Sequence, residues 1–478
     1  MRRTAAVGFL FAAIAVFYAA TIRPGNQWGD DFALFIRHAQ NLALGRNYTD
    51  TGYIYNPSAP EYSPRIYPPV FPLLLAPLCR LSGLNFAAMK REEVMFFLLA
   101  LLALYFYWWK SLDFPWLLAL VFLLGFNPVF WSAKDDVLSD LPFLFFFCLA
   151  ALLVQGAPRE GKESWKWALL AGLVLYLCIG TRSIGATLLP GIVLYDFLSR
   201  RRLSAFSLIA LGPPLALSLA QRALIGPGLG SYADQFHLTA RALLHNLAAY
   251  AHSLGTFWLA PDHRMFSAFV YGLLLVLALA GAWLRIRRGF TAMEAMVPPY
   301  VFLVLIWPVH KGIPRYLFPA LPVFVYWALT GLDGLTARLA RGYRVAGLAG
   351  LVALVGFSYI LSYRETGFGP IAESDGSVSF RALCQIVGAT TKPQDVFIYR
   401  RARALTLFTS RAAATYEPGD PAALWTCARR IHAGYVITNG QLAEDREFLV
   451  PLIKKFPDAF EPVYRNADFG LYRIRAYP

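Results

Sequence analysis

Trp28-Gly29-Asp30-Asp31-Phe32 is the stretch around which this chain is organised. Its two adjacent carboxylates lie about ten residues after the first apolar segment, 5–20, where a hydrophobic helix would leave a bilayer. Because ionised groups beside lipid are costly, an acid pair at this position indicates a function. The structural alternative is that Asp30 and Asp31 only cap the following helix, since aspartate favours helix N-termini.

The composition predicts a membrane protein. Of the 478 residues, 57% are hydrophobic and 15% are charged, whereas a soluble domain has about 25% charged residues. Long, recurrent apolar runs predict a polytopic α-helical membrane protein. The formal net charge is +15, but the basic clusters fall at alternate ends of the apolar runs, as the positive-inside rule requires. This distribution explains the charge without nucleic acid as a partner.

We expect about eleven transmembrane helices. The predicted spans are 5–20, 94–109, 115–130, 141–154, 167–179, 186–197, 203–220, 266–283, 297–307, 316–329 and 345–361. Met1-Arg2-Arg3 with the first span resembles a signal peptide, but the acid pair directly beyond it favours an uncleaved signal anchor. The N-terminus is then cytoplasmic, every strongly basic cluster lies on the same side, and Asp30 lies outside.

Two regions lie outside the predicted spans. The first outer loop, about 22–91, contains apolar residues at helical spacing over 32–44, which predicts a helix on the membrane surface. The segment 70–81 is apolar but too short to span. Residues 362–478 follow the membrane domain, 1–361, and predict a small extracytoplasmic α/β domain. Its expected strands are 395–399 and 435–438, its expected helices are 379–388, 421–432 and 442–456, and a hairpin joins 460–464 to 470–473. Cys384 and Cys427 could pair there or remain free thiols.

The predicted topology sorts the ionisable residues by side. On the outer side, near the ends of spans, lie Asp30, Asp31, Arg65, Asp135, Asp136, Asp140, Arg182, His310, Lys311 and Arg315. Because they come from separate loops, they could converge on one cavity at the outer membrane boundary. A carboxylate there could take a proton from a hydroxyl nucleophile, and arginines offer fork-shaped donors to a departing phosphate.

Several motifs occur together in one order. They are Gly29-Asp30-Asp31 followed by 39–45, Tyr67-Pro68-Pro69, Ser139-Asp140-Leu141-Pro142, Thr181-Arg182, the segment 315–322 and the tail segments 434–438 and 464–474. In order and sidedness this set resembles the GT-C membrane glycosyltransferases, in the branch of the protein O-mannosyltransferases and the lipid A aminoarabinose transferases. The resemblance covers almost the whole chain.

The resemblance implies an inverting glycosyltransferase that uses a polyprenyl- or dolichyl-phosphate sugar donor. The acceptor would be a glycan, a lipid or a protein at the outer face of the bacterial inner (plasma) membrane. The family's acidic base maps to Asp30, with Asp31 as its neighbour. The lipid phosphate would be held by Arg182 and Arg315, with Lys311 and His310 in support, and Arg65, Tyr67 and Asp140 would complete the substrate site. Where the aminoarabinose transferases carry a lysine, this chain offers Arg65 and Tyr67, so that donor is not assigned.

Simpler interpretations remain open for most of these residues. Asp135 and Asp136, beside Lys134, could form a solvated loop, and Asp140 could only cap a helix. Arg315 and Lys311 could extend to lipid headgroups without touching substrate. His237, His245, His252 and His263 are irregularly spaced and predict no metal triad. No cofactor is required by the sequence, but some relatives bind a divalent metal ion near the acids, so a metal stays open.

Two other functions compete with sugar transfer. A polytopic transporter or lipid flippase for a glycolipid would need broken spans and charges near the bilayer midplane, often with repeat symmetry. The charges of this chain lie at the predicted outer rim instead, and no repeat is visible. A non-catalytic assembly scaffold would explain the tail but not the acid pair with facing arginines.

Overall fold

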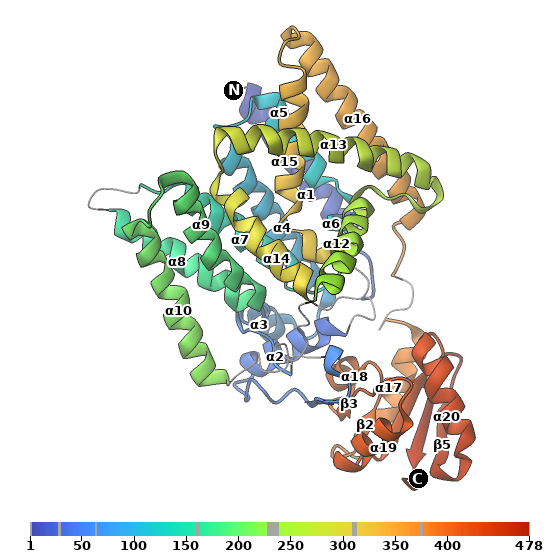
Figure 1. Cartoon of the computed structure of the whole chain (residues 1–478). Helices are drawn as coiled ribbons and strands as arrows, with labels where there is room; N and C mark the ends of the chain where they lie inside the picture. The colour runs from blue at the N-terminus through green and yellow to red at the C-terminus, as the bar shows by residue number, and fades with distance from the viewer. Residues whose placement is uncertain are drawn as a thin grey trace.

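The computed structural model of the chain describes residues 2–26, 30–62, 65–158, 163–226, 239–307, 313–371 and 376–477. A large helical body is followed by a smaller domain built around a β-sheet, which the end of the chain forms (Figure 1). The N-terminus lies at the end of the helical body remote from this domain, and α2 and α3 lie at the end close to it (Figure 1).

A helix occurs at each predicted span. These helices are α1 (Arg2–Ala20), α4 (Phe86–Trp108), α5 (Phe114–Gly125), α7 (Asp140–Gly156), α8 (Ser164–Thr181), α9 (Leu188–Arg200), α10 (Ala205–Ile225), α13 (Arg264–Arg288), α14 (Ala292–Ile306), α15 (Leu321–Leu335) and α16 (Arg341–Thr366). Within the described ranges, five segments are long and apolar enough to cross a membrane: Arg3–Ala20, Ser164–Thr181, Ala205–Ile225, Pro261–Arg288 and Arg341–Thr366. The total of about eleven spans therefore stays a prediction.

The predicted span over 115–130 is wrong as one continuous helix. α5 ends at Gly125, and a separate short helix, α6 (Pro128–Ala133), follows. Asn127 causes the break, because its side chain accepts a hydrogen bond from the Val129 backbone N–H and caps α6. The same side chain donates to the Phe257 carbonyl and the Tyr359 hydroxyl. These buried contacts fix the direction in which the chain continues towards Asp135, Asp136 and Asp140.

Two glycines allow α13 and α15 to pack backbone against backbone. A Cβ on Gly281 would stand 1.8 Å from the Trp327 carbonyl oxygen, and one on Gly331 would stand 2.0 Å from that of Leu277. Only glycine permits such an approach, which is a common device between helices in membranes. This contact holds α15 beside α13, and the short helix η5 (Pro314–Leu317), which carries Arg315, leads into α15.

The first outer loop forms two helices that pack against each other, α2 (Asp31–Ala43) and α3 (Val70–Ser82). The helix expected over 32–44 is thus present. Its apolar face does not lie open towards lipid, since Phe35 and Ile36 are buried together with Phe71 of α3 and Leu407 of α18 (Ala402–Thr409). This face of α2 is therefore covered by α3 and α18. The position of the helix on the membrane surface stays a prediction.

The C-terminal domain contains a six-stranded sheet in the order β1-β3-β2-β4-β6-β5. The strands are β1 (Tyr53–Ile54), β2 (Val396–Ile398), β3 (Ala412–Ala414), β4 (Tyr435–Asn439), β5 (Phe460–Arg465) and β6 (Phe469–Ile474). The first four in space run parallel, and β6 and β5 form the predicted antiparallel hairpin. Because β1 belongs to the first outer loop, this sheet is not built from residues 362–478 alone.

The predicted helices of the tail are also present, with one difference. They are α17 (Val378–Thr390), α19 (Pro421–Arg430) and, in the place of one helix over 442–456, the π-helical turn η6 (Asp445–Leu449) followed by α20 (Val450–Lys455). Cys384 and Cys427 are both free thiols. Two described elements of the tail were not predicted, β3 and α18, and α18 reaches the candidate site.

Candidate active site

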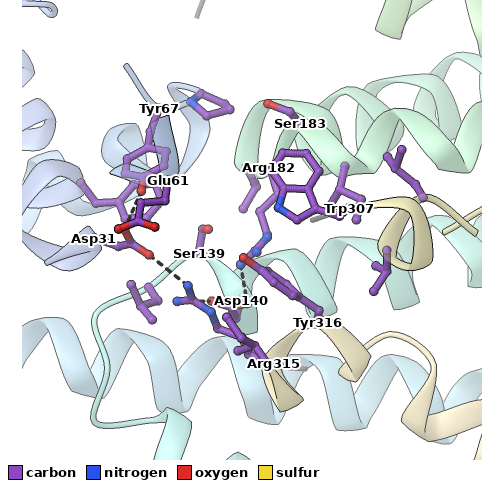
Figure 2. Close-up of a pocket in the computed structure, with 18 of the residues that line it drawn as sticks. Asp31, Glu61, Tyr67, Ser139, Asp140, Arg182, Ser183, Trp307, Arg315 and Tyr316 are labelled. Atoms are coloured by element: carbon purple, nitrogen blue, oxygen red, sulfur yellow. Dashed lines mark hydrogen bonds and ion pairs between the residues drawn. The ribbon is translucent and has the colours of Figure 1, made fainter. Parts of the chain in front are cut away.

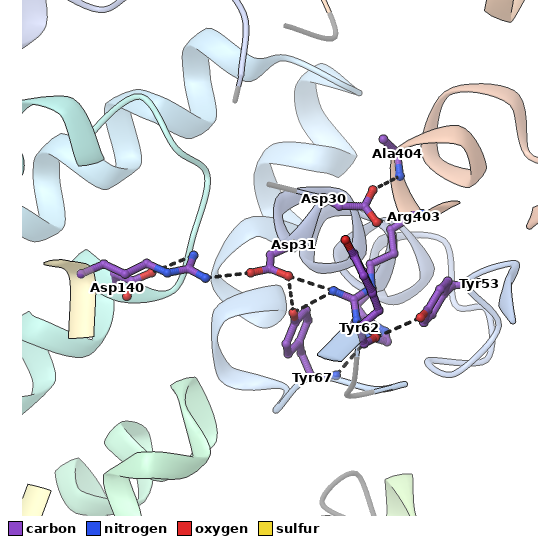
Figure 3. Close-up of polar contacts among 10 residues, drawn as sticks. Asp30, Asp31, Tyr53, Tyr62, Tyr67, Asp140, Arg403 and Ala404 are labelled. Carbon is purple, nitrogen blue, oxygen red and sulfur yellow. Dashed lines mark hydrogen bonds and ion pairs between the residues drawn. The ribbon is translucent and has the colours of Figure 1, made fainter. Parts of the chain in front are cut away.

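The acid pair at the start of α2 splits in two directions. Asp30 has a left-handed backbone conformation, with φ of 67°, and this turn separates its side chain from that of Asp31 (Figure 3). The Asp30 carboxylate is buried and accepts hydrogen bonds from the backbone N–H groups of Ala404, at 2.7 Å, and Arg403, at 3.3 Å. Asp30 thus holds the first turn of α18, where free N–H groups favour a carboxylate.

Asp30 therefore does not line the cavity that the sequence analysis expected it to face. Burial raises the pKa of its carboxyl, and the nearby guanidinium groups of Arg403 and Arg401 oppose this rise. The geometry gives Asp30 the contacts of a helix cap. Its catalytic role finds no support in this arrangement.

Asp31 is the carboxylate that faces the cavity. Its Oδ1 accepts hydrogen bonds from the Tyr67 hydroxyl and from Arg403 Nη1, each at 2.8 Å, and its Oδ2 accepts one from Arg315 Nη2 at 3.0 Å. Burial disfavours the charged form, but Arg315 and Arg403 outweigh it, so the pKa of Asp31 is lowered. Asp31 is thus a fixed carboxylate between two guanidinium groups (Figure 3).

A second ion pair lies across the same space. Arg182 follows α8 and pairs with Asp140, the first residue of α7. Arg315 Nη1 lies 3.9 Å from the other oxygen of Asp140, and Tyr316 places its ring beside both guanidinium groups. Figure 2 shows the two pairs, Asp31 with Arg315 and Asp140 with Arg182, joined by dashed lines in the pocket. Four segments far apart in the sequence therefore meet here.

These residues line a cavity of about 480 Å³, which we call the arginine cavity. This volume lies in the range of about 300–1,000 Å³ that small-molecule sites occupy. Its polar lining residues include Asp31, Glu61, Tyr67, Asp140, Arg182, Arg315 and Arg403, and the lining also contains Tyr250, Leu303, Val304, Trp307 and Ile313. The cavity therefore offers groups that can bind an anion and apolar surface that can contact an apolar chain.

Only some of the predicted site residues line the arginine cavity. Asp31, Tyr67, Asp140, Arg182 and Arg315 line the arginine cavity, as convergence of the outer loops requires. Arg65 is exposed and does not belong to the lining. His310 and Lys311 lie outside the described residues.

Asp135 and Asp136, the two other loop aspartates, also lie in different environments. Asp135 is buried away from the cavity and pairs with Arg23 at 2.8 Å and Lys134 at 2.7 Å. It ties the chain after α1 to the loop after α6. Asp136 lines a different cavity. The interpretation of this pair as a solvated loop is wrong for Asp135, because its carboxylate is not exposed.

Two residues of the site were not predicted, Arg403 and Glu61. Arg403 comes from α18 and is only 2% exposed, and Glu61 forms an ion pair with Arg400 at 3.0 Å. A signal for Arg403 existed, since Arg400, Arg401 and Arg403 directly follow the predicted strand 395–399. Side chains at the carboxyl ends of parallel strands gather at one edge of a sheet, where sites commonly lie.

The described residues do not form a metal centre. Among them, no group of three or more histidine, cysteine, aspartate or glutamate side chains could hold a metal ion. Asp31, Asp140 and Glu61 each pair with an arginine instead. The described residues of the arginine cavity therefore do not provide the ligand set of a divalent ion.

Comparison with known proteins places the fold. No family model and no curated protein matches the sequence. ArnT from Cupriavidus metallidurans, in a crystal structure bound to undecaprenyl phosphate, matches with a TM-score of 0.63 and 11% identity over 98% of both chains. An Archaeoglobus fulgidus oligosaccharyltransferase tethered to an acceptor peptide matches with a TM-score of 0.53 and 12% identity over 98% of this chain and 74% of that one.

A third similar structure is the arabinofuranosyltransferase AftD from Mycobacteria. Its TM-score is 0.50 at 12% identity, and the match covers 100% of this chain and 40% of AftD. All three proteins are GT-C glycosyltransferases. The chain therefore has the fold that the motifs indicated, a GT-C membrane fold, over its full length.

Proposed function

We propose that this protein is an inverting glycosyltransferase that moves a sugar from a polyprenyl phosphate to an acceptor at the outer face of the bacterial inner membrane. The observation that carries the proposal is the meeting of Arg182, Arg315 and Asp31 in one cavity whose lining also includes apolar side chains. The fold supports it, because proteins that share this fold are glycosyltransferases and one of them is bound to undecaprenyl phosphate.

The donor phosphate would bind to Arg182 and Arg315. Guanidinium groups donate two parallel hydrogen bonds to a phosphate, and these strengthen as charge grows on the departing oxygen. Each arginine now faces a carboxylate, Asp140 or Asp31, so a phosphate would compete for donors that are already directed into the cavity. The isoprenoid chain would then lie against Leu303, Val304 and Trp307.

The base in the proposed reaction is Asp31 and not Asp30. The acceptor oxygen forms a bond to the anomeric carbon, the bond from that carbon to the phosphate oxygen breaks, and the phosphate leaves with the electron pair. The proton of the acceptor passes to Asp31. Once Arg315 turns to the phosphate, Oδ2 of Asp31 loses its partner among the described residues and becomes the available acceptor, while Tyr67 and Arg403 still hold Oδ1. No step uses a metal ion.

The two aspartates provide the test. Purified protein in nanodiscs is incubated with undecaprenyl-phosphate sugars whose sugar is radiolabelled, and label leaving the lipid is counted. Asp31→Asn should lower transfer at least about 100-fold, because a general base contributes about 10²–10⁴-fold. Asp30→Asn keeps an oxygen that can accept from Ala404 and should retain transfer. Normal transfer by the Asp31 variant, or loss only in the Asp30 variant, contradicts this assignment.

The same preparation separates transfer from transport. A flippase would move the labelled lipid across a vesicle membrane and leave its sugar attached. Glycolipids and envelope glycans from a deletion strain, compared by mass spectrometry with those of the parent, identify the sugar and the acceptor. An intact donor pool on the wrong side of the membrane, with no glycan altered, would favour the flippase.

A further inference from the structure

A second cavity lies directly beside the arginine cavity. Its volume is about 330 Å³, also within the usual range for small-molecule sites. The two cavities share Asp31, Leu138, Ile313 and Arg315 in their linings. The ion pair of Asp31 with Arg315 is therefore part of the wall between them. We call the second space the Asp136 cavity.

The polar residues of the Asp136 cavity outside this wall are Asn26, Ser132 and Asp136, and Phe32, Val129, Val137 and Phe318 supply apolar surface. Asp136 differs from its neighbour Asp135, which two cations neutralise. No described residue donates a hydrogen bond or forms an ion pair with the Asp136 side chain. Its carboxylate thus remains available to a ligand in this cavity.

The electrostatics of Asp136 suit hydrogen bonding to neutral hydroxyl groups. Burial raises its pKa to about 7, Arg315 and Lys90 oppose the rise, and Asp135 and Asp140 add to it. A second anion in this space would be repelled by the charged form of Asp136. A ligand with several hydroxyl groups would instead donate to it, and could place its C–H faces against the apolar walls.

The direction of attack in an inverting displacement indicates which substrate this cavity binds. In a single displacement the acceptor oxygen approaches the anomeric carbon from the side opposite to the leaving phosphate. The proposed function puts that phosphate on Arg182 and Arg315 and puts the base at Asp31, in the wall between the cavities. An acceptor in the Asp136 cavity would reach Asp31 from the side remote from Arg182.

We propose that the Asp136 cavity is the acceptor site and that it binds the uncharged, hydroxyl-rich end of a glycan. The proposal rests on the proposed function and adds the position and the chemical class of the acceptor. Asp136 is its hydrogen-bonding anchor, and Asp31 takes the proton of the attacking hydroxyl. Binding of the donor draws Arg315 away from Asp31 and so opens the wall through which acceptor and donor meet.

The test compares transfer to a glycan with transfer to water. Octyl glycosides serve as acceptors for the labelled undecaprenyl-phosphate sugars, and label released as free sugar is counted separately. Asp136→Asn removes the anchor, and Ala133→Leu fills the cavity from its wall. Asp50→Asn makes the same change at an exposed carboxylate of the first outer loop and is the matched control.

For Asp136→Asn we expect the KM for the octyl glycoside to rise about 10- to 100-fold, the range for loss of one charge-assisted hydrogen bond. Ala133→Leu should also raise this KM, because its side chain takes the space of the acceptor. Release to water and the KM for the donor should stay within about twofold of the Asp50→Asn control. An unchanged glycoside KM in both variants overturns the acceptor site.

A binding measurement keeps the two proposals distinguishable. If the wild-type protein releases no sugar from any donor, the proposed function fails, and thermal stabilisation by octyl glycosides then tests the cavity alone. Stabilisation of the wild type that Ala133→Leu abolishes supports a glycan site. Equal stabilisation of both proteins, or none of either, overturns it.

Discussion

Replacing Arg403 by glutamine tests whether the C-terminal domain is part of the catalytic site. Arg403 Nη1 donates to Asp31 at 2.8 Å and to the Tyr67 hydroxyl at 3.1 Å, and Nη2 donates to the Tyr62 carbonyl. Its guanidinium thus joins α18 to α2 and to the loop that follows (Figure 3). Arg403→Gln removes the charge and most of these donors while preserving an uncharged polar side chain.

The size of the effect follows from burial. Removing one partner of a buried ion pair costs about 3–5 kcal/mol. The side chain of Asp31 keeps 25% exposure and retains Arg315, so the cost falls below this range, at about 2–3 kcal/mol. This free energy corresponds to a decrease of about 30- to 150-fold in the equilibrium constant for the arrangement that holds Asp31 in place.

The pH dependence gives a second readout. Arg403 helps to keep the pKa of Asp31 below its usual range, so its loss raises that pKa. A base must be ionised to accept a proton, and the acidic limb of the pH–rate profile should therefore move to higher pH. Arg403→Lys keeps the positive charge but loses the fork-shaped guanidinium. It should return the acidic limb of the pH–rate profile towards its wild-type position more fully than it restores the rate of transfer.

The control is Arg381→Gln, which changes an exposed arginine of α17 in the same domain. Transfer to octyl glycosides and limited proteolysis of the C-terminal domain are measured for all three variants. An Arg403→Gln protein with the rate, the pH profile and the protease resistance of the Arg381 control would refute the role of this domain in the site.

Three further outcomes can be checked on the same protein. Asp30→Ala removes the cap of α18 and should lower the free energy of unfolding of the C-terminal domain by about 1–2 kcal/mol. Denaturant titration of Asp30→Ala, with the wild type and Asp30→Asn as references, measures this change. Arg65→Gln should leave transfer within about twofold, because this side chain is exposed outside the cavity, and a tenfold loss would contradict that position. Gly281→Leu should lower the thermal midpoint in detergent, since a Cβ there meets the Trp327 carbonyl, whereas Gly350→Leu, with open space around it, should not.

The sequence alone predicted much of the fold. Apolar segments of span length mark the helices of the body, because length and hydrophobicity are local properties of the chain. Alternation of basic clusters put Asp31, Asp140, Arg182 and Arg315 on one side, and four such residues from four segments do line one cavity. Two strands of the tail, 395–399 and 435–438, and its closing hairpin were likewise visible as local patterns, whereas β1 and β3 were not predicted.

Only the tertiary structure decided which aspartate faces the cavity and which residues complete it. Adjacent side chains are equivalent in sequence, and the backbone turn at Asp30, with φ of 67°, sends one carboxylate to α18 and the other to Arg315. Arg403 and β1 join the site and the sheet through contacts more than 300 residues apart. Hydrophobic periodicity and charge report what a segment can bury, whereas the direction of a side chain depends on the distant partners that fill the space around it.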